Sequence, residues 1–142
     1  MILVDTGLLV ALVSESDDHH RRCREWFSTT DRSRLRVPAS IIAEACYMIA
    51  LLQGPAVEAA FLQDLANGAY GQLLDITSAD LRRMSQLVSQ YGDLPLGGTD
   101  ASLVAVAERV DSSEIATVDH RHFSVVRPRH TPSFTLLPAL AS

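Results

Sequence analysis

Short hydrophobic runs alternate along the chain with longer stretches in which apolar residues recur at helical spacing. The run Ile2-Leu3-Val4 has the composition of a strand covered on both faces, and the apolar residues that follow it repeat every three or four positions. The alternation continues and predicts strands at 2–4, 35–37, 72–76, 115–118 and 134–137, and helices at 6–13, 19–28, 39–53, 56–66, 77–91 and 99–110. Strands that alternate with helices predict an α/β fold with three layers, in which a mainly parallel central sheet carries helices on both faces.

Residues at the ends of the helical stretches agree with these boundaries. Pro38 suits the first turn of the third helix, and Gly54-Pro55 separates that helix from the next one. Thr77-Ser78-Ala79-Asp80 is close to a capping box at the start of the fifth helix. Polar loops are expected at 29–34 and 92–98.

The composition changes this picture little, because it is that of one ordinary globular domain over residues 1–142, with 47% hydrophobic and 20% charged residues. The two cysteines, Cys23 and Cys46, are not spaced as metal ligands. We therefore expect a reduced, cytoplasmic protein in which both cysteines pack against apolar neighbours. The N-terminal apolar stretch contains Asp5 and lacks a basic lead, and no run of about 18 apolar residues occurs, so neither a signal peptide nor a membrane span is expected.

The net charge of −5 argues against a nucleic-acid partner, but the basic residues qualify that argument. All 12 of them are arginines, and nine of these cluster at 21–36 and at 121–129. Arginine grips phosphate through two parallel hydrogen bonds, which would suit a nucleic acid. The complete absence of lysine also fits a compositional bias with solvated surface arginines, and we favour this second interpretation.

Two acids follow predicted strands directly. Asp5 ends the first strand and Asp119 ends the strand at 115–118. The carboxyl ends of parallel strands lie at one edge of a sheet, where open α/β folds bind their ligands. Asp5 alone has an equally good explanation as the N-cap of the helix that follows it.

Two further acids are predicted to face the sheet from helices. Asp100 shares a helix face with Leu103 and Val104, and Glu44 lies at helical spacing from Ile41 and Met48. Buried carboxylates need a cationic partner, and the only arginine close in sequence to any of these four acids is near Asp119. Four carboxylates at one edge therefore predict a site for Mg²⁺ or Mn²⁺, which prefer oxygen ligands.

The stretches that hold these acids resemble a known family. They are Ile2-Leu3-Val4-Asp5-Thr6, the helix around Glu44, Thr99-Asp100-Ala101-Ser102-Leu103-Val104-Ala105, and Ala116-Thr117-Val118-Asp119-His120-Arg121-His122-Phe123. In order and spacing they are similar to the PIN domain, and most of all to the VapC-type ribonuclease toxins of bacterial toxin–antitoxin pairs. The resemblance covers essentially the whole chain.

The resemblance implies a Mg²⁺- or Mn²⁺-dependent endoribonuclease whose metal-binding and catalytic residues are Asp5, Glu44, Asp100 and Asp119. Water would attack a phosphodiester of single-stranded or looped RNA and leave 5′-phosphate and 3′-hydroxyl ends. It also implies a homodimer and a cognate VapB-type antitoxin that blocks the site. Some relatives carry a further acid or Asn shortly after the fourth acid, where this chain has His120-Arg121-His122.

Several residues close in sequence to Asp5, Asp100 and Asp119 have two possible roles. Thr6 and Thr117 suit hydrogen bonds to a carboxylate as well as ordinary capping and strand roles, and Arg121 suits contact with phosphate or neutralisation of Asp119. Asp93 is explained more simply by turn chemistry. The histidine pairs at 19–20 and 120–122 lack zinc-ligand spacing, so we expect them to be solvated.

Other functions that use an Asp after the first strand fit less well. Haloacid-dehalogenase-type phosphatases need a second Asp where the chain has Gly7, and both they and response-regulator receivers use a lysine. The glycine pattern of a dinucleotide site is missing after the first strand. The remaining alternative is a catalytically silent PIN-like module that binds RNA or protein, and the four filled acidic positions argue against it.

Overall fold

The computed structural model describes residues 1–139, so the last three residues of the domain predicted over 1–142 lie outside the described residues. The described part contains β1 (Ile2–Val4), α1 (Thr6–Val13), α2 (His20–Thr29), β2 (Leu35–Pro38), α3 (Ile42–Gln53), α4 (Pro55–Ala66), β3 (Gln72–Leu74), α5 (Ser78–Gln90), α6 (Gly98–Val110), β4 (Glu114–Ala116), α7 (His120–Val125) and β5 (Thr135–Leu137). Short 3-10 helices at Arg32–Arg34 and Ala39–Ile41 precede β2 and α3.

The five strands form one sheet with the order β3-β2-β1-β4-β5, and every neighbouring pair is parallel. β1 lies in the centre, where Leu3 pairs with Arg36 of β2 on one side and Ile115 of β4 on the other. Its three residues are at most 1% exposed, which explains why the sequence at this point is purely hydrophobic. The predicted parallel α/β architecture is confirmed.

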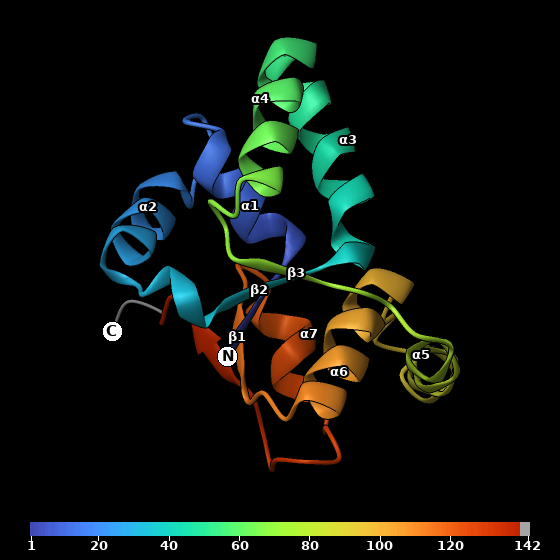
Figure 1. The fold of residues 1–142 in the computed structure, drawn as a ribbon. Coiled ribbons are helices and arrows are strands. Elements are labelled where there is room, and N and C mark those ends of the chain that lie inside the picture. The colour runs from blue at the N-terminus through green and yellow to red at the C-terminus, as the bar shows by residue number, and fades with distance from the viewer. Residues whose placement is uncertain (140–142) are drawn as a thin grey trace.

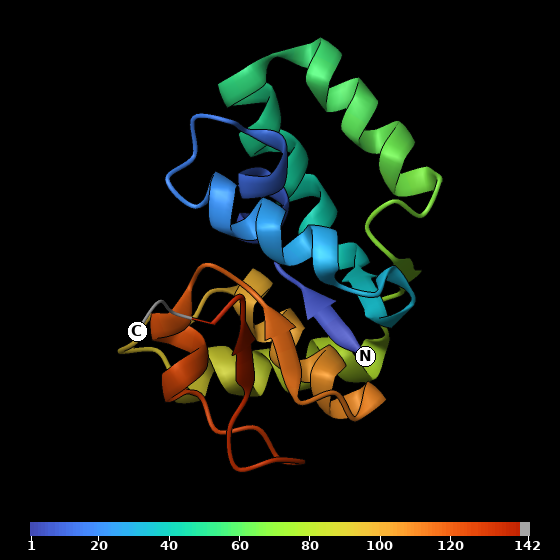
Figure 2. The same cartoon turned by 90° about the vertical axis from the view of Figure 1, so that its left-hand side faces the viewer.

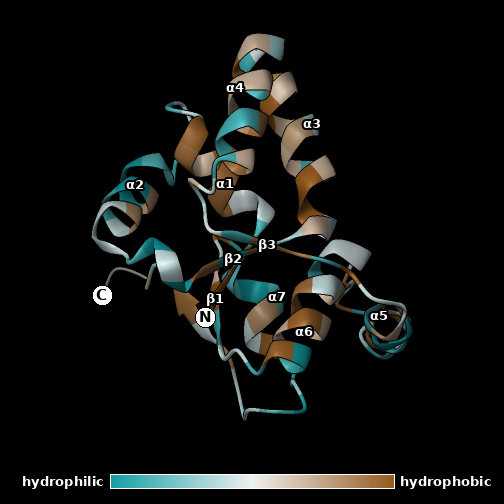
Figure 3. Ribbon diagram, viewed as in Figure 1, coloured by the Kyte–Doolittle hydropathy of each residue, from teal (hydrophilic) through white to brown (hydrophobic). Residues whose placement is uncertain are grey.

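Helices cover both faces of the sheet. Figures 1 and 2 show α1 to α4, coloured blue to green, on one side and α5 to α7, coloured yellow to red, on the other. α1 packs against α2 and α3, and α5 packs against α6. The hydropathy colouring in Figure 3 separates the mostly hydrophobic α3 from the mostly hydrophilic α2, whose outer side faces solvent.

The sequence-based boundaries hold within a few residues, and the strands predicted at 72–76 and 115–118 each end two residues early, at Leu74 and Ala116. The exception is a six-residue helix, α7, which begins at His120 where no helix was expected. Part of the loop expected at 29–34 forms the 3-10 helix Arg32–Arg34. The capping box is confirmed, because Thr77 accepts from the N–H of Asp80 and the Asp80 carboxylate accepts from the N–H of Thr77.

Within residues 1–139, the structure has no helix with the length and apolar character that a membrane crossing requires.

Candidate active site

The four predicted acids lie around one cavity. Asp5, Glu44, Asp100 and Asp119 all line this space of about 340 Å³, together with Thr6, Gly7, Val10, Asp17, Met48 and Val118. β1 and β4 are adjacent and parallel, so the segments that leave their carboxyl ends arrive at the same place. The sequence-based prediction that these acids converge is therefore what the structure shows.

Asp5 is the most deeply buried of the four, with 5% of its surface exposed. It is the N-cap of α1: its Oδ1 accepts from the N–H of Thr6 at 2.7 Å, and its Oδ2 accepts from the hydroxyl of Thr117 at 2.8 Å. The structure confirms Asp5 as a helix cap, and the same carboxylate lines the cavity. Burial raises the pKa of Asp5 from its ordinary 3.8 to about 6; the two hydrogen bonds oppose this rise, and the carboxylates of Asp100 and Asp119 add to it.

Thr117 connects two of the acids. Its hydroxyl donates to Asp5 and accepts from the backbone N–H of Asp119 at 2.9 Å, and its side chain is fully buried. One hydroxyl therefore fixes the orientation of the Asp5 carboxylate and the path of the chain toward Asp119.

Asp119 is the N-cap of α7, and His122 lies one turn further along. The Asp119 carboxylate accepts from the backbone N–H of His122 at 3.2 Å through Oδ1, and its Oδ2 lies 2.6 Å from Nδ1 of the same residue. The His122 Nδ1 also lies 3.2 Å from Oδ2 of Asp100. The expectation that this histidine is solvated is wrong. That expectation considered only the spacing between the two histidines. The pair that lies on one face is Asp119 and His122, at positions i and i+3.

Asp100 lies in the first turn of α6 and is half-buried. Burial raises its pKa, the neighbouring Asp119 carboxylate raises it further, and His122 acts in the opposite direction. Its expected orientation toward the sheet is borne out by the cavity that it shares with Asp5 and Asp119.

Glu44 reaches the cavity but is not buried, which corrects the prediction from its helix. The buried stripe of this segment runs through Ile41, Ala45 and Ile49, each four residues from the next. Glu44 is one position off that stripe, so its side chain lies at the rim of the cavity rather than beneath it. It is close enough to Asp100 for its charge to raise the pKa of that carboxyl.

All four acids occupy the same kind of position, the start of a helix. Asp5 and Asp119 are the N-caps of α1 and α7, and Glu44 and Asp100 lie in the first turns of α3 and α6. The partial positive charge at a helix N-terminus stabilises a carboxylate by about 0.3–1 kcal/mol. The four helix N-termini around the cavity thus offset part of the repulsion between the acids.

The donor set fits a divalent cation. Among the described residues, the arginines in ion pairs contact Glu25, Asp80, Glu108 and Glu114, and none contacts the four acids. Thr6 lines the cavity with 6% of its surface exposed, and among residues 1–139 its buried hydroxyl oxygen has no hydrogen-bond partner. Carboxylate oxygens with an unsatisfied hydroxyl beside them are suited to Mg²⁺ or Mn²⁺ and the polar groups that accompany such an ion.

Of three further charged residues, Asp93 and Arg121 do not line the cavity, and Asp17 does. Asp93 is exposed and does not line the cavity, in agreement with its interpretation as a turn residue. Arg121 is exposed, and the ion pairs within residues 1–139 do not join it to Asp119. Asp17 also lines the cavity, although the sequence did not single it out as a candidate site residue.

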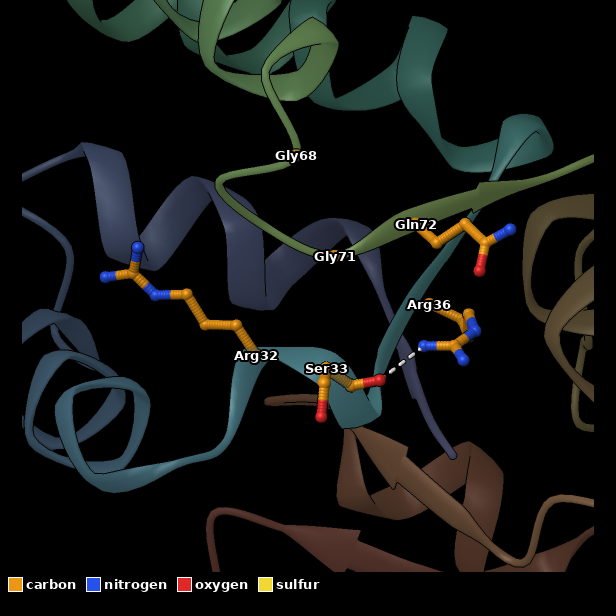
Figure 4. Close-up of a pocket in the computed structure, with 6 residues that line it drawn as sticks. All are labelled: Arg32, Ser33, Arg36, Gly68, Gly71 and Gln72. Carbon is orange, nitrogen blue, oxygen red and sulfur yellow. Dashed lines mark hydrogen bonds between the residues drawn. The ribbon is translucent and has the colours of Figure 1, made fainter.

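A second cavity, of about 480 Å³, lies at the amino ends of β2 and β3, whereas the acids lie at carboxyl ends. It is lined by Arg32, Ser33, Arg36, Gly68, Gly71 and Gln72. Figure 4 shows the two arginine side chains pointing away from each other. The Arg32 guanidinium lies 4.9 Å from the Phe27 ring centre, and Arg36 donates to the carbonyls of Ser33 and Leu35. These arginines do not converge on one anion, which supports the interpretation of this cluster as surface charge.

Comparisons with known proteins agree with the fold. The family model for the PIN domain matches residues 2–127. Ribonuclease VapC26 of Mycobacterium tuberculosis is 31% identical over 137 residues, which cover 96% of this chain and 100% of that protein.

Solved structures show the same fold at lower identity. VapC20 of Mycobacterium tuberculosis, described as a sarcin–ricin loop cleaving toxin, superposes with a TM-score of 0.74 at 13% identity over 81% of this chain and 87% of that one. FitAcB of Neisseria gonorrhoeae superposes with a TM-score of 0.65 at 18% identity over 84% and 88% of the two chains. A structure of FitAB bound to an IR36 DNA fragment gives a TM-score of 0.66 at 19% identity, over 84% and 85%.

Proposed function

The chain belongs to the PIN-domain family, and from this premise we propose that it is a VapC-type toxin that hydrolyses RNA phosphodiester bonds with Mg²⁺ or Mn²⁺. Asp5, Glu44, Asp100 and Asp119 hold the ion, and the whole chain acts as one PIN domain. The observation that carries the proposal is the convergence of these four acids on one cavity without arginine partners. The identity of 31% to a ribonuclease along the full length supports the choice of RNA as substrate.

The ion, when bound, activates water and stabilises the negative charge that develops on the phosphate. The chain's own residues prepare the place for it. Thr6 and Thr117 hold the two oxygens of Asp5, and the N–H of His122 holds one oxygen of Asp119, so neither carboxylate has to be ordered when RNA arrives.

The same family membership leads us to propose a cognate VapB-type antitoxin and a homodimer as partners. An exposed apolar surface on α3 and α4 supports a protein partner, since large hydrophobic side chains there face solvent: Tyr47 is 68% exposed, Leu51 68%, Leu52 48% and Leu62 44%. These residues lie on the helix that carries Glu44 and on its neighbour. A partner seated there would stand beside the rim of the cavity.

The proposed activity is tested by incubating the purified chain with total RNA and either Mg²⁺ or Mn²⁺, beside samples with EDTA. We expect cleavage that stops with EDTA and returns when excess metal is added. Asp100→Asn removes a carboxylate from the cavity and should lower cleavage at least about 100-fold. Asp93→Asn is the matched control, because it removes an exposed carboxylate outside the cavity and should leave cleavage unchanged.

Cleavage that persists in EDTA, or in the Asp100→Asn protein, would overturn the proposed mechanism. Tight binding of RNA without any cleavage would instead identify a silent RNA-binding module.

A further inference from the structure

The side chain of His122 contacts two of the four acids, Asp100 and Asp119, through one ring nitrogen. Its Nδ1 lies 2.6 Å from a carboxylate oxygen of Asp119 and 3.2 Å from one of Asp100. One oxygen of each acid and one ring nitrogen of His122 lie within 4.8 Å of one another. The imidazole is half-buried, and its backbone N–H is already used by Asp119, so the residue is held from both main chain and side chain.

These separations match hydrogen bonds within the protein, and they also match neighbouring ligands around one ion. Bonds of roughly 2.0–2.2 Å at right angles place adjacent ligand atoms about 3 Å apart. The two distances from His122 Nδ1 lie on either side of that value. A neutral imidazole whose proton is on Nε2 presents its Nδ1 lone pair to such an ion.

Thr6 gives an independent indication that a ligand belongs here. Thr6 begins α1, on the other side of the sheet from α6 and α7, and this residue lines the cavity shared by Asp100 and Asp119. Its hydroxyl oxygen is buried and has no hydrogen-bond partner among the described residues. Native structures rarely leave such a group unsatisfied unless something absent from the chain satisfies it.

We propose that His122 is a nitrogen ligand of the metal ion held by Asp100 and Asp119, and that this nitrogen makes the site select Mn²⁺ over Mg²⁺. The inference rests on the proposed function and specifies the metal that serves it. Mg²⁺ takes oxygen ligands almost entirely, whereas affinity for nitrogen donors increases from Mg²⁺ to the transition metals.

The test is pulsed electron paramagnetic resonance of Mn²⁺ bound to the full chain without RNA. A directly coordinated imidazole nitrogen modulates the electron spin echo of Mn²⁺, and a histidine that merely positions a carboxylate does not. We expect this nitrogen modulation in the wild type and in His120→Asn. We expect its loss in His122→Asp and His122→Ala, both of which still bind Mn²⁺ through the remaining acids.

His120 is the matched control because it lies in α7 two residues from His122, a spacing that puts it on a different face. Calorimetric titration of the same proteins gives the selectivity. His122→Ala should weaken Mn²⁺ binding roughly 10-fold or more and change Mg²⁺ binding much less. His122→Asp should restore tight binding but with a smaller preference for Mn²⁺, since every ligand is then an oxygen.

A wild-type Mn²⁺ complex without nitrogen modulation overturns the inference, as does modulation that survives in His122→Asp or disappears in His120→Asn. If such a protein still cleaves RNA in a metal-dependent way, the proposed function stands and only the role of His122 fails. A wild type that binds neither ion and does not cleave RNA overturns both.

Discussion

Replacement of Asp5 by Asn should make the metal-free protein more stable. The carboxylate is 5% exposed, and burial is the largest cause of its raised pKa, with Asp100 and Asp119 adding repulsion. Asn is the same size and remains neutral, so it removes the buried charge. Its carbonyl can still accept from the N–H of Thr6, and its amide can donate to the hydroxyl of Thr117.

The magnitude follows from the pKa of Asp5, which is about 6 in the folded protein against an ordinary value of 3.8. Each pKa unit corresponds to 1.36 kcal/mol, so the charge of Asp5 lowers the free energy of unfolding by about 3 kcal/mol above pH 7. Between pH 4 and 6 the folded protein keeps a proton that the unfolded chain releases. The disadvantage of the wild type therefore shrinks as the pH falls, to about 1 kcal/mol at pH 4.5.

The assay is urea denaturation of wild type and Asp5→Asn in EDTA at pH 7.5 and 4.5. Asp93→Asn, which changes an exposed carboxylate, is the control and should stay within about 0.5 kcal/mol of the wild type. Mn²⁺ at 100 times its dissociation constant should stabilise the wild type by about 2.7 kcal/mol and the variant much less, so that the difference nearly closes. Equal stabilities in EDTA at pH 7.5, or a less stable variant, would refute the argument that Asp5 is a strained, buried charge.

Two further substitutions test the local structure around and away from the cavity. Gly7→Ala places a Cβ 2.6 Å from Cγ2 of Val118 and should lower the free energy of unfolding by about 1–3 kcal/mol, whereas Gly98→Ala meets nothing within 4 Å. Thermal unfolding measures the difference, and equal melting temperatures would contradict the close contact between α1 and the segment after β4. Thr77→Ala removes the hydroxyl that caps the N–H of Asp80 and should cost about 1 kcal/mol in urea denaturation, and an unchanged midpoint would show that this cap adds no stability.

The sequence was sufficient for those parts of the fold that burial dictates. β1 lies in the centre of the sheet, so both of its faces require hydrophobic residues, and Ile2-Leu3-Val4 shows this directly. Once the strands are parallel, acids that follow β1 and β4 must lie at the same edge of the sheet. That shared edge could therefore be predicted without coordinates, whereas the pairing of β1 with β4, which brings Asp5 and Asp119 together, comes from the structure.

Other parts of the site depend on structure that leaves little mark on hydrophobic periodicity. α7 has six residues, and only Phe123 among them is buried, so there is no repeat from which the helix could be read. Without that helix, the i and i+3 relation between Asp119 and His122 was missed, although Asp119 is a favoured N-cap residue. The exposure of Glu44 was misjudged because α3 is apolar on several sides, including exposed positions such as Tyr47 and Leu51.

The helix N-termini stabilise the four carboxylates by less than the burial of charge in the cavity costs. A helix N-terminus contributes about 0.3–1 kcal/mol to a nearby carboxylate, yet the charge of Asp5 alone costs about 3 kcal/mol in the folded protein. The capping bond from Thr6 and the hydroxyl of Thr117 are included in that balance, because they already lower the pKa that burial raises to about 6. The chain therefore keeps a repulsion that its own dipoles and donors do not remove, and a divalent cation can relieve it. This residual repulsion favours cation binding in the absence of RNA, so we expect metal to raise folding stability over the same concentration range in which it supports cleavage.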